Sequence, residues 1–105
     1  MVVTFEKEYL RDLYETGSTT DKKYRFQPEI VKSYKRRIKT LEAASRIEDL
    51  FIIGSLNYEV LKGDKQGISS IRVNKQYRIE FTVSEEESEP VVTVCNILEL
   101  SNHYK

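Results

Sequence analysis

Residues 61–81 read LKGDKQGISSIRVNKQYRIEF, and this pattern predicts two neighbouring strands joined by a tight turn. Over 77–83, apolar or aromatic residues alternate with polar ones, which is typical of a strand with one buried face. The strand before it, near 68–73, shares that core face only if the turn has an odd number of residues, such as 74–76. This register places Arg72 opposite Arg78. Because like charges facing each other destabilise a sheet, the pair suggests a function that needs concentrated positive charge, such as holding phosphate.

Charge is unevenly distributed along the chain. The 17 basic and 17 acidic residues cancel, which argues against a protein that binds naked nucleic acid by bulk charge alone. Segment 62–78 nevertheless has a local excess of four positive charges, while 85–89 is an acidic run that we interpret as a solvated loop between strands. This distribution is consistent with an RNA site on one side. The cations of the basic segment are Lys62, Lys65, Arg72, Lys75 and Arg78.

The rest of the chain predicts an α+β fold. A short strand at 2–5 precedes a helix that carries Tyr9, Leu10, Leu13 and Tyr14 and ends at Gly17. Pro28 suits the first turn of a second helix. Its apolar stripe recurs every three or four residues, and a cationic side faces water, either as a solubilising surface or as a patch for phosphates. A helical turn near 47–50 and strands at 58–62 and 91–97 complete a curved, mainly antiparallel sheet of four to five strands. The stripe is Val31, Tyr34, Ile38 and Leu41, and the cations are Lys32, Lys35, Arg36 and Lys39.

Length and composition limit the function classes. The 105 residues fit a single domain, 1–105, and 32% charged with 39% hydrophobic residues is typical of a soluble globular protein. We expect no membrane span and no export signal, which together with a single cysteine, Cys95, fits the cytoplasm. One histidine, one cysteine and no glycine-rich phosphate loop predict no metal, no cofactor and no use of nucleoside triphosphates.

Segment 61–81 resembles the HigB-type toxins of toxin–antitoxin pairs, within the RelE/ParE superfamily. The resemblance extends to residues 13–18, to 41–44 with 48–50 after it, and to the terminal residues 102–105. It implies the RelE-like microbial RNase fold. Members of the RelE and HigB branches are ribosome-dependent mRNA endonucleases, whereas members of the ParE branch poison gyrase, so two functions remain open.

Cleaving RNA without a metal requires a base for the 2′-hydroxyl, cations for the charge that builds on the phosphate, and an acid for the leaving oxygen. His103 is the natural acid–base candidate because its unperturbed pKa lies near neutrality, although a lone histidine near a chain end is usually an exposed bystander. Lys62, Arg72 and Arg78 could neutralise the phosphate. Tyr104 could stack on a base or donate a proton.

The resemblance assigns roles to particular positions. Lys62 is the lysine of the family's Leu-Lys-Gly-Asp motif, and Arg78 follows the aromatic position, here Tyr77. The family's terminal Asp-Tyr-His falls on His103-Tyr104-Lys105, so the tyrosine is kept and the histidine is displaced. Glu59 stands where those members have a histidine, either as a second base or as an exposed strand carboxylate. The expected catalytic residues are His103, Arg78, Lys62, Tyr104 and Glu59, and the expected RNA-binding residues are Arg72, Lys65, Lys75, Lys105 and Tyr77.

The resemblance therefore implies a type II toxin that cuts mRNA in the ribosomal A site. Its expected partners are the ribosome with its mRNA and a HigA-like helix-turn-helix antitoxin, with operator DNA reached only through that antitoxin. Two alternatives stay open. One is a ParE-like gyrase inhibitor without nuclease activity, and the other is a degenerate member that only binds its antitoxin or RNA.

Overall fold

The computed structural model describes residues 1–102. They form five strands, two α-helices and four 3₁₀ turns. In chain order these are β1 (Val2–Phe5), α1 (Glu8–Glu15), η1 (Lys22–Tyr24), α2 (Pro28–Ala43), η2 (Ile47–Leu50), η3 (Gly54–Leu56), β2 (Glu59–Val60), η4 (Gly63–Lys65), β3 (Ser69–Arg72), β4 (Tyr77–Glu86) and β5 (Val92–Asn102).

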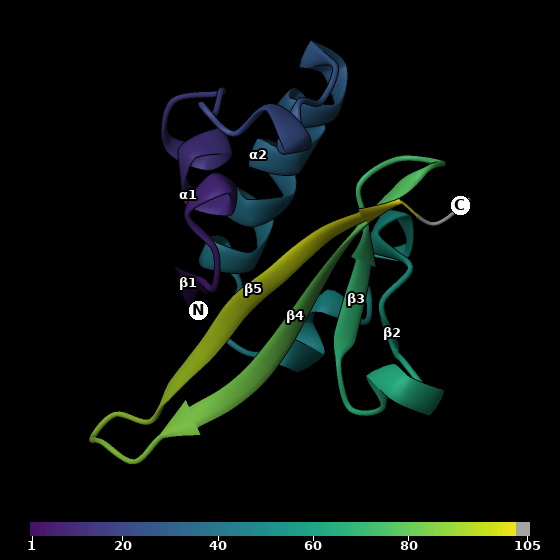
Figure 1. Cartoon of the computed structure of the whole chain (residues 1–105). Coiled ribbons are helices and arrows are strands. Elements are labelled where there is room, and N and C mark those ends of the chain that lie inside the picture. Colours follow the sequence, from purple (N-terminus) through teal and green to yellow (C-terminus); the bar gives the residue numbers. More distant parts are fainter. Residues whose placement is uncertain (103–105) are drawn as a thin grey trace.

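The strands build one five-stranded sheet in the order β1-β5-β4-β3-β2. β1 runs parallel to β5, and every other neighbouring pair is antiparallel. The two helices lie together on one side, and the long β4–β5 hairpin projects away from them (Figure 1). The predicted α+β architecture with a mainly antiparallel sheet is therefore confirmed.

The helices form where the apolar spacing predicted them. In α2 the stripe of Tyr34, Ile38 and Leu41 is completely buried, and Pro28 occupies the first helical turn. α1 is followed by Gly17, whose φ of +80° lets the chain reverse direction while its N–H donates to the Leu13 carbonyl at 3.1 Å. Tyr34 ties the helices together, since its hydroxyl donates to the Leu10 carbonyl at 2.7 Å.

The core lies between the helices and one face of the sheet. Ile71, Ile79 and Phe81 supply that face and are fully buried together with the helical stripe. β5 carries a bulge, because Glu80 pairs with Glu99 while the next residue, Phe81, pairs with Ile97. Because of the bulge, Ile97 before it and Leu100 after it both face the core. Within residues 1–102, no helix is both long and apolar enough to cross a membrane.

Three predicted boundaries were wrong. The strand expected at 58–62 shrinks to Glu59–Val60, because Asn57 is left-handed at φ +45° and the chain turns away again at η4. β4 and β5 extend past their predicted ends, so Glu85 and Glu86, expected in a loop, pair with Thr93 and Val92 in the ladder. Backbone hydrogen bonds continue along this exposed hairpin, although apolar and polar residues do not alternate in its sequence.

Candidate nucleic-acid site

The predicted site residues that the structure brings together lie on the sheet face opposite the core. The register confirms the three-residue turn 74–76, with Arg72 paired to Arg78 and the Val73 N–H donating to the Tyr77 carbonyl at 2.9 Å. Asn74 shapes this turn, because its Oδ1 accepts from the N–H groups of Gln76 and Tyr77 at 2.8 and 2.7 Å. The turn therefore positions two arginines side by side.

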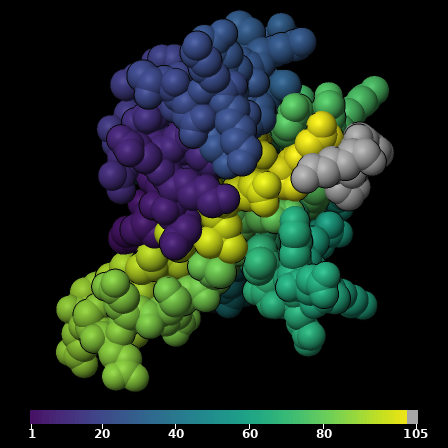
Figure 2. All heavy atoms as spheres, viewed as in Figure 1, coloured from purple at the N-terminus to yellow at the C-terminus, as the bar shows by residue number. Residues whose placement is uncertain are grey.

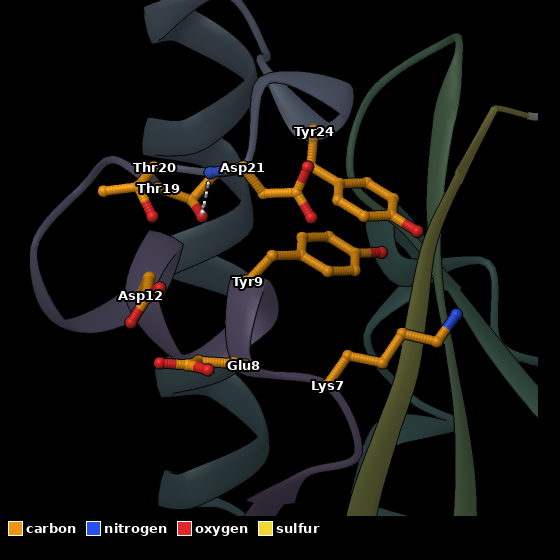
Figure 3. Close-up of a pocket in the computed structure, with 8 residues that line it drawn as sticks. All are labelled: Lys7, Glu8, Tyr9, Asp12, Thr19, Thr20, Asp21 and Tyr24. Atoms are coloured by element: carbon orange, nitrogen blue, oxygen red, sulfur yellow. Dashed lines mark hydrogen bonds between the residues drawn. The ribbon is translucent and has the colours of Figure 1, made fainter.

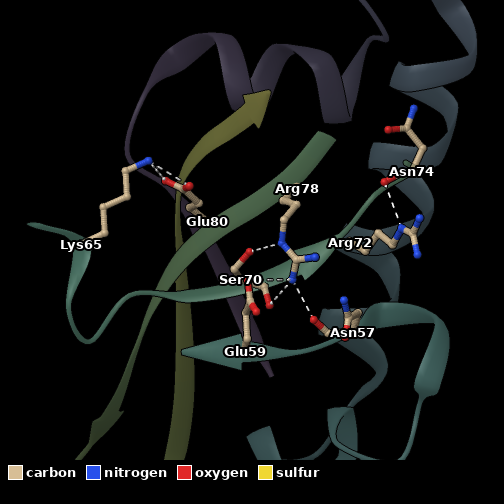
Figure 4. Close-up of polar contacts among 8 residues, drawn as sticks. All are labelled: Asn57, Glu59, Lys65, Ser70, Arg72, Asn74, Arg78 and Glu80. Atoms are coloured by element: carbon tan, nitrogen blue, oxygen red, sulfur yellow. Dashed lines mark hydrogen bonds and ion pairs between the residues drawn. The ribbon is translucent and has the colours of Figure 1, made fainter. Parts of the chain in front are cut away.

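Arg78 is held in one orientation by its neighbours. Its Nε donates to Ser70 Oγ at 2.5 Å, and its Nη2 donates to the Asn57 and Ser70 carbonyls at 2.7 and 3.2 Å (Figure 4). Only 7% of the residue is exposed. Burial lowers the pKa of the guanidinium, and the nearby charge of Glu59 opposes that shift. Among residues 1–102, Nη1 is the guanidinium nitrogen that has no hydrogen-bond partner.

Glu59 lies beside Arg78 on the edge strand β2. Its Oε1 is 3.8 Å from Arg78 Nη2, and its side chain is 48% exposed. Glu59 pairs in register with Ser70, which also contacts Arg78. The carboxylate is thus within reach of solvent and of the arginine together, so it can either accept a proton or hold the guanidinium in place.

Arg72 is half-buried, and its Nε donates to the carbonyl of Asn74 at 3.2 Å. Lys75 is exposed at the tip of the turn. Tyr77 points to the opposite face, where its ring meets Phe26 edge to face with centroids 5.4 Å apart. Tyr77 therefore borders the core rather than the arginine pair, and it does not share a face with Arg72.

Lys62 and Lys65 differ in their surroundings. Lys62 is exposed, and its side chain makes no hydrogen bond or ion pair within residues 1–102. Lys65 donates from Nζ to both carboxylate oxygens of Glu80 at 3.0 Å each (Figure 4). This hydrogen bonding raises the pKa of Lys65. Lys65 thus offsets the repulsion between Glu80 and its register partner Glu99.

Sequence reasoning missed Ser70, Asn57 and Glu80 as partners of these cations. A signal for two of them was present, because the three-residue turn pairs Ser70 with Glu80 on the same face as Arg78. No pattern in the sequence indicated that the Asn57 carbonyl, which arrives from a loop, would meet the guanidinium.

His103, Tyr104 and Lys105 lie outside the described residues. The last described position, Asn102, pairs with Tyr77, and Ser101 pairs with Arg78. β5 therefore carries the chain along the strand that holds Arg78. Among residues 1–102, no group of three or more histidine, cysteine, aspartate or glutamate side chains could hold a metal ion.

A separate surface pocket of about 410 Å³ lies between α1 and the loop after it. One wall is the stacked pair Tyr9 and Tyr24, with ring centroids 3.7 Å apart (Figure 3). The Leu100 N–H donates to the Tyr9 hydroxyl, and burial raises the pKa of Tyr9 to about 12. None of the predicted site residues within 1–102 lines this pocket.

Comparisons with solved structures support the fold. The YoeB/ParE toxin from Agrobacterium tumefaciens matches with a TM-score of 0.60 and 21% identity, covering 99% of this chain and 100% of that one. A YoeB–YefM complex from Staphylococcus aureus matches with a TM-score of 0.56 and 21% identity, covering 99% and 98%. At this identity the likeness concerns the fold alone.

Comparisons of sequence identify the family. The model of the RelE-like toxin of the type II toxin–antitoxin system HigB matches residues 3–93. Toxin HigB-1 of Vibrio cholerae serotype O1 is 37% identical over 82 residues, which are 77% of this chain and 82% of that toxin. Because both matches span most of its length, the chain belongs to the HigB-like family of RelE-like toxins of type II toxin–antitoxin systems.

Proposed function

We propose that this toxin is a ribosome-dependent endoribonuclease that cuts mRNA in the ribosomal A site without a metal. Family membership supports an endoribonuclease in general terms. The observation that carries the proposal is the pairing of Arg72 with Arg78 on the sheet face opposite the core, next to the exposed Glu59. Two cations that face each other do not stabilise a sheet. A bound phosphodiester would supply the negative charge that balances them.

We infer from the geometry how the residues share the work of the reaction. The 2′-oxygen of the RNA loses its proton to a base and attacks the phosphorus, and the 5′-oxygen leaves as it gains a proton. Arg78 is the main phosphate ligand, because its other nitrogens are fixed and Nη1 remains for a phosphate oxygen. A donor fixed in advance costs no reorganisation as charge develops. Arg72 adds positive charge beside Arg78, and we assign Lys62 to the phosphate as a further cation.

Proton transfer falls to the terminal residues and to Glu59. We assign acid–base work to His103 and base stacking or proton donation to Tyr104, both beyond the described residues. Lys105 contributes charge to the RNA. Glu59 is the second base candidate. Its Oε1 lies 3.8 Å from Arg78 Nη2, and its exposure allows a substrate hydroxyl to approach.

Three of the predicted RNA-binding residues have lesser roles in our proposal. Lys75 is exposed at the turn tip and free to approach RNA. Lys65 remains a candidate for contacting the RNA backbone, although it already forms an ion pair with Glu80. Tyr77 acts indirectly, since it supports the strand from the core side.

The proposed partners follow from the family. The chain acts as one domain, 1–105, in the cytoplasm, bound and neutralised by a HigA-like helix-turn-helix antitoxin. The toxin reaches operator DNA only through that antitoxin. A solved neighbour with the same fold is a YoeB–YefM complex.

The test maps mRNA 5′ ends in a purified translation reaction, with and without ribosomes. Wild-type protein should create new ends at A-site codons only when ribosomes are present. His103→Ala and Arg78→Lys should each lower cleavage by about 10²-fold or more, because the first removes an acid–base group and the second removes a planar guanidinium that is held in place. Lys23→Ala, an exposed cation on η1, is the control and should cut normally. Intact mRNA in every reaction would overturn the proposal.

One observation favours a second candidate. Arg78 is already paired with Glu59 and Lys65 with Glu80, so two predicted phosphate ligands have internal partners. A degenerate member that only binds its antitoxin would show this arrangement. Such a protein would leave mRNA intact, would not arrest growth on expression and would not inhibit gyrase in a supercoiling assay. Gyrase inhibition would instead identify a ParE-like toxin.

A further inference from the structure

The water-facing side of α2 is a continuous row of cations. Lys32, Lys35, Arg36 and Lys39 recur at helical spacings of three and four, so they share one face. Among residues 1–102, these four line a shallow groove of about 330 Å³. From Lys32 to Lys39 the row is about 10 Å long. The helix therefore presents a rigid ladder of positive charge.

These cations have no acidic partners. Within residues 1–102, none of the four takes part in an ion pair or a side-chain hydrogen bond. Burial, followed by the adjacent charge of Arg36, lowers the pKa of Arg37 on the same helix. Positive charge on α2 is thus concentrated and uncompensated, although the whole chain is neutral.

The row lacks the apolar centre that protein partners require. The exposed large hydrophobic residues of the described chain are Val2, Phe51, Ile52, Val60 and Val91, and none lies on α2. The centre of a protein–protein interface is apolar and contains few charged residues. Nucleic-acid backbones are instead recognised by clustered lysine and arginine side chains. The surface fits a phosphate backbone better than a protein.

The row is also separate from the arginine pair. α2 packs on α1 and on the β1 end of the sheet, while Arg72 and Arg78 lie on β3 and β4. The acidic residues 85–89 are at the tip of the β4–β5 hairpin, far from the helices in Figure 2, in a molecule 40 Å long. Although its net charge is zero, the chain therefore carries positive charge on α2 and negative charge at the tip of the β4–β5 hairpin.

We propose that the α2 cation row is a docking surface for ribosomal RNA, binding its phosphate backbone apart from the site that cuts mRNA. This inference rests on the proposed function, which supplies the ribosome as the partner. The row holds the toxin on the ribosome by contacts that do not depend on sequence, and the arginine pair then meets the mRNA.

A matched pair of variants tests this surface. Lys32→Gln/Arg36→Gln removes a lysine and an arginine four residues apart on α2. Lys7→Gln/Arg11→Gln removes the same types at the same spacing at α1, and all four residues are exposed. Glutamine keeps helix propensity close to that of lysine and arginine. Lys32→Arg/Arg36→Lys keeps the charge and should behave as wild type.

The measurement is binding to purified small ribosomal subunits free of mRNA, over a series of salt concentrations. The α2 variant should bind at least about tenfold more weakly, and its salt slope should fall by about 1 to 2, because two phosphate contacts are lost. The α1 variant should keep the wild-type slope. Equal weakening in both variants would overturn the inference, since bulk charge would explain it.

Parallel assays separate the possible failures. If wild type cuts mRNA on ribosomes but the α2 variant binds subunits normally, the docking surface is wrong and the proposed function stands. If the α2 variant loses only antitoxin binding, or only operator binding with the antitoxin, the row serves that partner and the inference is overturned. If wild type neither binds subunits nor cuts mRNA, both proposals fail together.

Discussion

Arg78 shows what one buried cation requires of its neighbours. Only 7% of the residue is exposed. Its guanidinium donates hydrogen bonds to one hydroxyl and two carbonyls, and a carboxylate lies nearby. Burying a charge without partners would cost several kcal/mol. Sequence alternation predicted that Arg78 faces away from the core, and it does. Alternation did not predict its burial, because the covering groups come from β3 and from the loop before β2.

The contact between Ser70 and Arg78 can be tested by removing the hydroxyl. Ser70→Ala leaves the Nε of a buried guanidinium without its acceptor and should lower the free energy of unfolding by about 1 to 3 kcal/mol. Urea denaturation measures the loss. Ser84→Ala, an exposed position on β4, should change stability by less than about 0.5 kcal/mol. Equal stability of the two variants would show that the Ser70 hydroxyl does not support Arg78.

At the scale of elements, periodic segments were predictable and their ends were not. Both helices follow apolar spacings of three and four, and the three-residue turn fixed the pairing of β3 with β4. The length of β2 depends on the left-handed Asn57 and on the turn at η4. The extension of β4 depends on its ladder with β5. These causes are backbone contacts, which leave no hydrophobic pattern.

The end of α1 allows a paired test of backbone strain. Gly17→Ala places a side chain at φ +80° and should destabilise the fold by roughly 1 to 2 kcal/mol, although the new Cβ has room, 3.8 Å from Lys35 Nζ. Gly54→Ala meets no atom within 4 Å and has no positive φ, so it should be neutral or slightly stabilising. Thermal unfolding compares the two. A similar loss in both would attribute the effect to something other than φ.

At the scale of the whole molecule, the sequence predicted the fold class but only part of the site. It predicted the Arg72 and Arg78 pair because register follows from turn length. It did not predict that Lys65 binds Glu80, since η4 folds back over the sheet through tertiary contacts. Nor did it place Tyr77 against Phe26, which lies far away along the chain. The neutral total charge concealed the separation of cations on α2 from acids on the hairpin.

The fold as a whole should lose stability at alkaline pH. Burial raises the pKa of the Cys95 thiol from 9.0 to about 11, so folding favours the protonated thiol. That stabilisation is complete below pH 9 and is lost as the pH rises from 9 to 11. Tyr9, with its pKa raised from 10.0 to about 12, continues the loss above pH 10.

Urea unfolding at pH 8, 9, 10 and 11 measures this dependence. Cys95→Ala should be less stable at pH 8, because it leaves a small cavity, but should show a shallower decline between pH 9 and 10. In the folded wild type at pH 8, iodoacetamide should modify Cys95 far more slowly than in the urea-unfolded chain. Parallel stability curves for the two proteins would contradict a buried, protonated thiol.

The pairing of β1 with β5 has a consequence for how the chain matures. Thr4 bonds Asn96 across 92 positions, and β5 is the strand between β1 and β4. A growing polypeptide therefore cannot close its sheet until β5 has been made, and until then β1 has no neighbour and one edge of β4 is unpaired. Assembly of the native protein waits for the last strand. Until β5 has been made, the nascent chain of this toxin lacks its complete sheet.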